Sequence, residues 1–200
     1  MPIASPATTA LLLIDVQKEF VLDGRPLAIP DAAKVIDRLV AALALWHQRG
    51  WPVVHIHHEE AADAALFAKG SFAQQPHRAL AFGANDVQIT KRQPGAFTGT
   101  QLEKELRIRG VEAVLITGFM THLCCDTTAR EAAARGFSVY FPSDGTSSPP
   151  LKDRGFGALS PLQIKAQVHT VMQSFATVAP LAELLPARAE FPGTGGTETS

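Results

Sequence analysis

Cysteine is scarce in this 200-residue chain, which holds only two, Cys124 and Cys125, side by side. Neither has a distant partner with which to close a loop, so a structural disulfide is not expected and a reducing compartment fits. An excess of charge is also missing, because 18 basic residues face 19 acidic ones. Without a basic run, the sequence does not indicate binding to nucleic acid or to an anionic membrane.

Long hydrophobic runs are absent as well. The first apolar run, Ala10 to Ile14, is too short for a membrane span, and no positively charged segment precedes it as in a signal sequence. We therefore expect a cytoplasmic protein with no membrane contact. With 46% hydrophobic residues and no internal repeat or linker, the chain predicts a single domain. Its core is expected over about residues 8–186, followed by a disordered, glycine- and threonine-rich tail over about residues 192–200.

Short apolar runs alternate along the chain with segments of helical periodicity. The unbroken run Leu11–Ile14 is typical of a strand buried on both faces, as in parallel sheets. Strands are expected at residues 11–14, 53–57, 87–90, 114–116, 137–141 and 177–178. This alternation predicts an α/β fold of three α/β/α layers, with a doubly wound, mostly parallel sheet of about six strands.

Local signals mark two helix starts and one long surface segment. Ser160 with Gln163, and Thr100 with Glu103, have the spacing of capping boxes. Residues 59–86 have weak periodicity and predict a long excursion over the surface. Loops of this length in a compact domain often carry function.

Residues 111–136 carry the first candidate for chemistry. An apolar strand, a tight turn at Gly118 and an alanine-rich helix ending at Gly136 account for this stretch. Thr121 is expected to cap the helix, which places Cys124 in its first turn. There the free N–H groups and the helix dipole favour a thiolate, so Cys124 can be a nucleophile. The alternative is a buried cysteine that acts only as a small apolar residue.

Two further reactive side chains are expected at the same edge of the sheet. Asp15 ends the first predicted strand, Lys91 ends the third, and Cys124 follows the fourth. Ligands of open parallel sheets bind beyond the carboxyl ends of the strands. There Asp15 can accept the thiol proton and return it to a leaving amine, while Lys91 favours the thiolate. Backbone N–H groups of the turn can stabilise an oxyanion, so the set indicates acyl transfer through a thioester. Taken singly, Asp15 could cap a turn and Lys91 could be a surface charge.

Three motifs give this chain a family resemblance. They are L-L-L-I-D-V-Q-K-E-F at residues 11–20, T-K-R-Q-P-G-A-F-T-G-T at 90–100 and T-G-F-M-T-H-L-C-C-D-T-T-A at 117–129. With them, over roughly residues 8 to 179, the chain resembles the isochorismatase-like cysteine hydrolases. The resemblance implies that Asp15, Lys91 and Cys124 form the catalytic triad. It also implies a non-proline cis peptide at Phe119–Met120, which aims the Met120 and Cys124 amides at the oxyanion.

The substrate pocket is less clearly marked. The side chains expected to contact the substrate are Gln17, Phe20, His58, Phe97 and Thr121. For Gln17, Phe20 and Phe97, packing in the core or in a loop is an equal alternative. The identity of the small-molecule substrate cannot be read from the sequence.

The run from His55 to Glu60 contains three candidate metal ligands, His55, His57 and His58. Nicotinamidases of the resembled family bind a divalent ion through an aspartate and histidines after the second strand. His58 and Glu60 fall where that pattern has Asp and His, so the pattern is not met. We expect no metal and no other cofactor, although the histidine cluster leaves this question open. The resemblance further implies a homo-oligomer, a dimer or a tetramer.

The leading interpretation is a metal-independent cysteine hydrolase that cleaves a small amide or a related C–N bond. An isochorismatase that opens a vinyl ether is the first alternative, although that reaction does not need the cysteine. A redox centre of Cys124 and Cys125 is the second, and it requires a strained ring between adjacent cysteines. A non-catalytic binding protein is the third.

Overall fold

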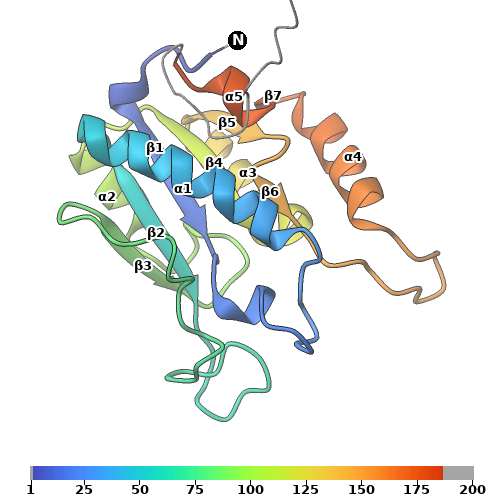
Figure 1. The fold of residues 1–200 in the computed structure, drawn as a ribbon. Coiled ribbons are helices and arrows are strands. Elements are labelled where there is room, and N and C mark those ends of the chain that lie inside the picture. Colours follow the sequence, from blue (N-terminus) through green and yellow to red (C-terminus); the bar gives the residue numbers. More distant parts are fainter. Residues whose placement is uncertain (1, 187–200) are drawn as a thin grey trace, which may run out of the picture.

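Seven parallel strands form one sheet at the centre of the computed structural model, which describes residues 2–186 (Figure 1). The strands follow the order β3-β2-β1-β4-β5-β7, and the short β6 pairs with the end of β4. Their bounds are β1 Thr9–Ile14, β2 Val53–His58, β3 Val87–Lys91, β4 Ala113–Phe119, β5 Ser138–Pro142, β6 Thr146–Ser147 and β7 Thr177–Ala179. The sheet has one strand more than expected, because β6 is too short to be recognised in a sequence.

Helices cover both faces of this sheet. Their bounds are α1 Ala32–Arg49, α2 Leu102–Ile108, α3 Asp126–Ala134, α4 Pro161–Met172 and α5 Leu181–Leu184. Apolar side chains of α1 and α5 pack against one face, in a core that includes Leu11 and Leu13 of β1. Those of α2 and α3 pack against the other face, with Leu12 and Ile14. The three-layer α/β/α architecture is therefore confirmed.

The expected helix starts had different outcomes. The Ser160 capping box is present, since Ser160 Oγ accepts from the Gln163 N–H and Gln163 Oε1 accepts from the Ser160 N–H. The second box is wrong. Thr100 Oγ1 accepts from the N–H of Leu102, and the Glu103 carboxylate forms ion pairs with arginines instead of reaching back.

The ends of the domain differ slightly from expectation. The core begins earlier than residue 8, because Ile3 is buried and its N–H donates to the Leu184 carbonyl at 2.8 Å. The tail expected over residues 192–200 lies outside the described residues. None of the helices between residues 2 and 186 is long and apolar enough to cross a membrane.

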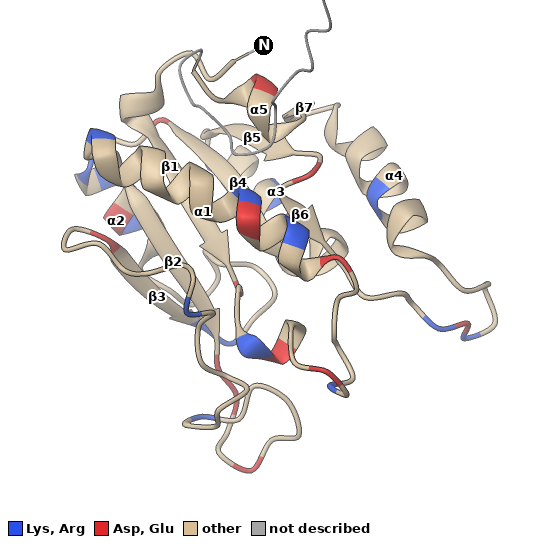
Figure 2. Cartoon of the chain, viewed as in Figure 1, with Lys and Arg blue, Asp and Glu red and all other residues tan. Residues whose placement is uncertain are grey.

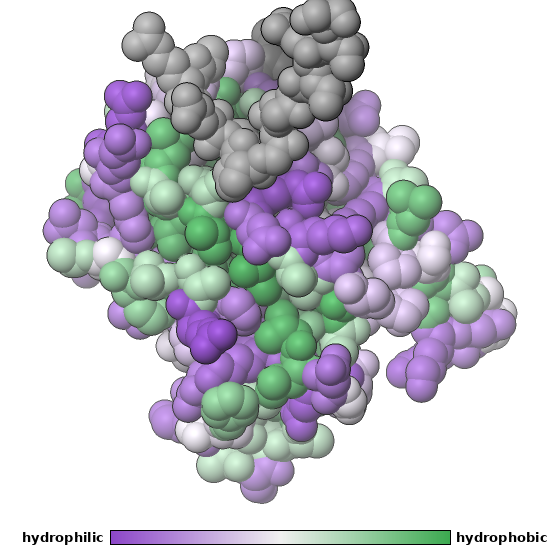
Figure 3. All heavy atoms as spheres, viewed as in Figure 1, coloured by the Kyte–Doolittle hydropathy of each residue, from purple (hydrophilic) through white to green (hydrophobic). Residues whose placement is uncertain are grey.

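Charged residues of both signs are scattered over the face of the molecule drawn in Figure 2. In the space-filling view from the same side, a band of hydrophobic side chains runs diagonally across the middle of the face, with hydrophilic side chains on either side of it (Figure 3). The two signs are nearly balanced in the sequence, with 18 basic and 19 acidic residues.

The surface excursion over residues 59–86 runs past the carboxyl ends of β1 and β2 (Figure 1). A buried carboxylate fastens it to the loop after β1. Glu19 Oε1 pairs with Arg25 at 2.6 Å, and Glu19 Oε2 accepts from the N–H of Phe67 at 3.3 Å. A second tie is the bond from the His77 N–H to the Val16 carbonyl at 2.8 Å. The segment is therefore held against the edge of the sheet where Asp15 and Lys91 end their strands.

Gly118 at the end of β4 allows a test of how closely two central strands approach. Its φ is +109°, and a Cβ atom there would lie 2.1 Å from the Ile14 carbonyl oxygen. Gly136 has a φ of +81° with nothing within 4 Å of such an atom. An alanine there would therefore add only the backbone strain of a positive φ and no steric clash. We expect Gly136→Ala to lower the free energy of unfolding by about 1 kcal/mol and Gly118→Ala by about 3 kcal/mol or more. Urea unfolding measures both, and equal losses would contradict the predicted close approach.

Candidate active site

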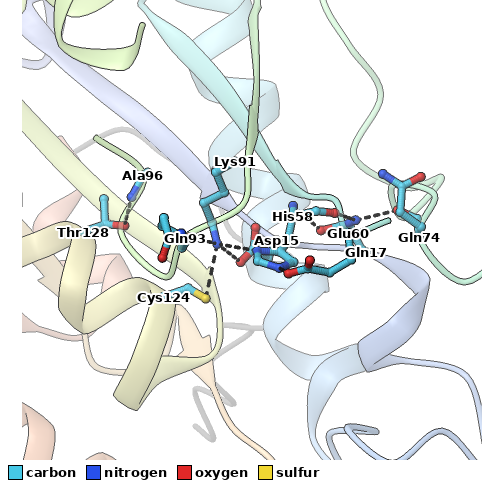
Figure 4. Close-up of polar contacts among 10 residues, drawn as sticks. All are labelled: Asp15, Gln17, His58, Glu60, Gln74, Lys91, Gln93, Ala96, Cys124 and Thr128. Carbon is cyan, nitrogen blue, oxygen red and sulfur yellow. Dashed lines mark hydrogen bonds and ion pairs between the residues drawn. The ribbon is translucent and has the colours of Figure 1, made fainter. Parts of the chain in front are cut away.

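Three reactive side chains meet at the carboxyl edge of the sheet (Figure 4). The Lys91 ammonium lies 2.8 Å from Asp15 Oδ2 and 3.3 Å from Cys124 Sγ. Asp15 and Lys91 are each 1% exposed and Cys124 is 6% exposed. Asp15 follows β1, Lys91 ends β3, and Cys124 lies in the turn after β4. The prediction that these residues gather at one edge is confirmed.

The backbone around Asp15 is unusual. Its φ of +50° is in the left-handed region, which residues other than glycine seldom adopt and which is common at functional sites. The Asp15 N–H donates to the Ile56 carbonyl of β2 at 2.8 Å, so the residue remains tied to the sheet. Its second carboxylate oxygen, Oδ1, is buried and has no hydrogen-bond partner among residues 2–186. Asp15 therefore keeps one oxygen free to accept a proton.

Cys124 was expected in the first turn of an α-helix, but the structure places it elsewhere. Residues Thr121–Cys125 form a single π-helical turn, and α3 begins only at Asp126. Thr121 does not cap this turn with its side chain, because its hydroxyl donates to Thr146 Oγ1 of β6 at 2.9 Å. The helix ends before Gly136, which has the positive φ expected of it.

The expectation of a lowered thiol pKa is wrong for this structure. Burial, together with the negative charge of Asp15, raises the pKa of Cys124 to about 12, and Lys91 offsets only part of this effect. Burial by itself would lower the pKa of Lys91, but Asp15 and Cys124 outweigh it and the pKa is raised. The resting site therefore contains a thiol beside a firmly protonated lysine.

The turn before Cys124 has the backbone geometry implied by the resemblance. The Phe119–Met120 peptide bond is cis. The hydrogen bonds among residues 2–186 include none from the Met120 N–H. Met120 and His122 also line a cleft of about 530 Å³, whose other wall comes largely from residues 149–159. The turn that carries Cys124 thus has a backbone donor without a partner among these residues on Met120, a residue that also lines the cleft.

Several residues expected to contact the substrate are buried and have partners inside the fold. Gln17 is fully buried, and its side-chain amide donates to the His58 carbonyl at 2.9 Å and accepts from the His58 N–H at 2.8 Å. Phe20 is 1% exposed and packs against Phe67 and Phe119. Gln17 and Phe20 therefore stabilise the segments that carry the site residues, Gln17 through hydrogen bonds and Phe20 through packing.

Phe97 and Thr121 are likewise buried. Phe97 packs against Phe137 with ring centroids 5.9 Å apart, in the core on the α2 and α3 side of the sheet. Thr121 has no exposed surface. Of the five residues expected to contact the substrate, His58 is the one whose side chain has a polar contact with Asp15, Lys91 or Cys124 among the described residues, with Nδ1 3.3 Å from Lys91 Nζ.

Two contacts of the site were not anticipated. The Gln93 carbonyl accepts from Lys91 Nζ at 3.1 Å, and Glu60 Oε1 lies 2.7 Å from His58 Nε2. The Gln93 contact involves a backbone atom, so no residue type indicated it. Glu60 stands two residues after His58, and this spacing was the available signal for the second contact.

The histidines after Val54 do not converge on one centre. His58 faces Lys91, whereas His55 Nε2 lies 2.9 Å from Asp86 Oδ2, which is also 2.9 Å from His47 Nε2. Neither nitrogen of His57 has a hydrogen-bond partner among the described residues, and burial lowers the pKa of His57 to about 4. Among residues 2–186, no three His, Cys, Asp or Glu side chains are arranged to hold a metal ion.

His57 predicts a loss of stability in acid. Its pKa in the folded protein, about 4, is below the ordinary value of 6.5, so between these values the unfolded chain binds a proton that the folded chain excludes. Its contribution is complete above pH 6.5 and declines as the pH falls towards 4. We expect His57→Phe to reduce the loss of unfolding free energy between pH 7 and pH 4.5 by on the order of 2 kcal/mol. Urea titrations at both pH values measure it, and an unchanged difference would contradict it.

The raised thiol pKa predicts a gain of reactivity on removing a charge. Asp15→Asn eliminates the anion that disfavours the thiolate while Lys91 remains, so Cys124 is expected to be alkylated about tenfold faster at pH 8. Iodoacetamide labelling followed by peptide mass spectrometry measures this rate. Cys125, which has no exposed surface, serves as the internal control and should stay unlabelled. Slower labelling of Cys124 in the variant would contradict the assigned cause.

Comparison with known proteins places this geometry in a family. The model of the isochorismatase domain matches residues 9–182. The isochorismatase family protein YrdC of Bacillus subtilis is 29% identical over 177 residues, which cover 88% of this chain and 94% of that protein. The ureidoacrylate amidohydrolase RutB of Methylobacterium radiotolerans is 29% identical over 179 residues, covering 72% of this chain and 69% of that protein.

A solved structure agrees with the sequence comparison. The crystal structure of a cysteine hydrolase from Pseudomonas syringae pv. phaseolicola superposes with a TM-score of 0.85 at 26% identity, covering 92% of each chain. The family model covers the sheet and its flanking helices, and the solved structure has the same fold. The chain therefore belongs to the isochorismatase family of hydrolases.

Proposed function

We propose that this hydrolase cleaves a small amide or a related C–N bond without a metal, through a thioester on Cys124. The main support for this proposal is that one buried ammonium group, Lys91, contacts both the Asp15 carboxylate and the Cys124 sulfur. A base, a nucleophile and a fixed positive charge are the groups that acyl transfer through a thiol requires. Similarity to an amidohydrolase, RutB, supports the amide class.

Acylation begins with the Cys124 thiol, because the raised pKa keeps it protonated. Asp15 accepts the thiol proton as the sulfur attacks the substrate carbonyl and a C–S bond forms. The carbonyl oxygen becomes an oxyanion, to which the free Met120 N–H, and the Cys124 N–H with it, donate. When this intermediate collapses, the C–N bond breaks and Asp15 returns its proton to the leaving amine.

Deacylation repeats these steps with water. Asp15 takes a proton from a water molecule, which attacks the thioester carbonyl. The C–S bond then breaks, the acid is released, and the sulfur regains its proton from Asp15. Lys91 stays charged throughout and stabilises whichever of Asp15 and Cys124 is the anion.

The cleft beside Met120 supports a small-molecule substrate. Its volume of about 530 Å³ is in the range of ligand pockets, which run from ~300 to ~1,000 Å³. Apolar side chains dominate its wall, among them Leu27 and Leu151, while His122, Lys152 and Arg154 contribute polar or charged groups. We therefore expect an amide whose acyl or amine part has a compact apolar body.

A panel of small amides with such apolar bodies tests the proposal. Hydrolysis is expected for at least one member, with Cys124→Ala lowering kcat by 10³-fold or more, on the order seen when a nucleophile is removed. Stopping the reaction early and measuring intact mass should reveal an acyl group on Cys124. Cys125→Ala is the matched control and is expected to keep most activity, because Cys125 is fully buried behind the triad residue.

Two results would overturn this proposal. Turnover that persists in Cys124→Ala would exclude the thioester route. Turnover of isochorismate, with no amide hydrolysed by the wild-type protein, would favour the vinyl ether reaction instead.

A further inference from the structure

Lys91 has more hydrogen-bond acceptors than protons. An ammonium group donates three hydrogen bonds. Around Lys91 Nζ lie Asp15 Oδ2 at 2.8 Å, the Gln93 carbonyl at 3.1 Å, and both Cys124 Sγ and His58 Nδ1 at 3.3 Å (Figure 4). The two nearer oxygens each take one proton, so the sulfur and the imidazole compete for the third.

The neighbour of His58 determines which imidazole nitrogen can compete. Glu60 Oε1 lies 2.7 Å from Nε2, and a carboxylate can only accept, so Nε2 carries the proton. In the neutral ring Nδ1 is then a lone-pair acceptor directed at the Lys91 ammonium. The opposite tautomer would direct an N–H group at a positive charge.

Backbone contacts hold Glu60 and His58 in this arrangement. The Glu60 N–H donates to the Phe67 carbonyl at 2.9 Å, and the Lys69 N–H donates to the Glu60 carbonyl at 3.2 Å. The Phe67 ring packs edge-on against the His58 ring, with centroids 5.0 Å apart. Gln17 binds both backbone groups of His58. Contacts from the loop after β1 and from the excursion over residues 59–86 thus keep the imidazole next to Lys91.

We propose that His58, oriented by Glu60, is a positioning residue that shares the third proton of Lys91 with the Cys124 sulfur. When Cys124 is a thiolate, the third N–H of Lys91 donates its hydrogen bond to the sulfur. When the sulfur is acylated and has lost its charge, the same N–H donates to His58 Nδ1 instead, which keeps the ammonium in place beside Asp15. His58 acts through Lys91, not on the substrate.

This proposal deepens the proposed function and rests on it for the acylated state, but its test needs no substrate. Two variants distinguish the effect of the His58 hydrogen-bond acceptor from the effect of its aromatic ring. His58→Phe keeps the aromatic packing on Phe67 and removes the acceptor. His58→Asn places an amide oxygen at about the position of Nδ1, so it retains the acceptor.

Alkylation of Cys124 at pH 8 measures the competition. In His58→Phe the third proton is no longer shared, so labelling is expected to be about tenfold faster than in the wild type, as for a hydrogen bond to a charged group. In His58→Asn the rate should stay within about twofold of the wild type, since the acceptor is restored. Equal rates in all three proteins, or equal acceleration in both variants, would overturn the proposal.

The tautomer provides an independent measurement on the wild-type protein. Two-dimensional ¹⁵N–¹H NMR of the histidine rings at pH 8 distinguishes Nε2–H from Nδ1–H, and His58→Asn identifies the signals that belong to His58. We expect the proton on Nε2. A proton on Nδ1 would overturn the proposal even if His58→Phe failed to fold. If labelling and tautomer agree while no amide is hydrolysed, the proposed function fails and the positioning role stands.

Discussion

The buried ion pair between Lys91 and Asp15 is the interaction on which the rest of the site depends. Removing two charges from water is costly, and their attraction repays this only with good geometry and further hydrogen bonds. Lys91 obtains these from the Gln93 carbonyl, Cys124 and His58, whereas one oxygen of Asp15 remains without a partner. Because Asp15 Oδ1 has no hydrogen-bond partner in the described part of the chain, this ion pair is poor evidence for a stabilising role. A buried, unpartnered carboxylate oxygen is instead what a catalytic base needs.

The sheet supplies the rigidity that such a pair requires. β1 and β4 are buried along their whole length and pair in register from Thr9 to Ile14, so the residues that follow them have little freedom. β2 lies between β1 and β3 and sets the distance from Asp15 to Lys91. Catalytic groups held on strand ends keep their geometry better than groups on loops. The excursion over residues 59–86, in contrast, adds its contacts from outside the sheet.

Burial gives the cysteine of this site a particular reactivity. A thiol with a raised pKa is a weak nucleophile and resists oxidation until a base removes its proton. Asp15 is that base in the proposed mechanism, and Lys91 stabilises the thiolate that forms when Asp15 takes the proton. In that mechanism the thiolate forms only as the sulfur attacks a substrate. The expectation based on a helix terminus failed because it considered one element and not the surrounding core.

The sequence by itself determined which reactive residues share an edge of the sheet. Asp15, Lys91 and Cys124 each follow an apolar run of strand length, and parallel strands bring their carboxyl ends together. Only the tertiary structure decided the protonation of the thiol and the roles of Gln17 and Phe97. These depend on burial and on partners far away along the chain, such as the backbone of β2, which local patterns do not encode. Residue order specified where the chemistry lies, and long-range packing decided which side chains take part in it.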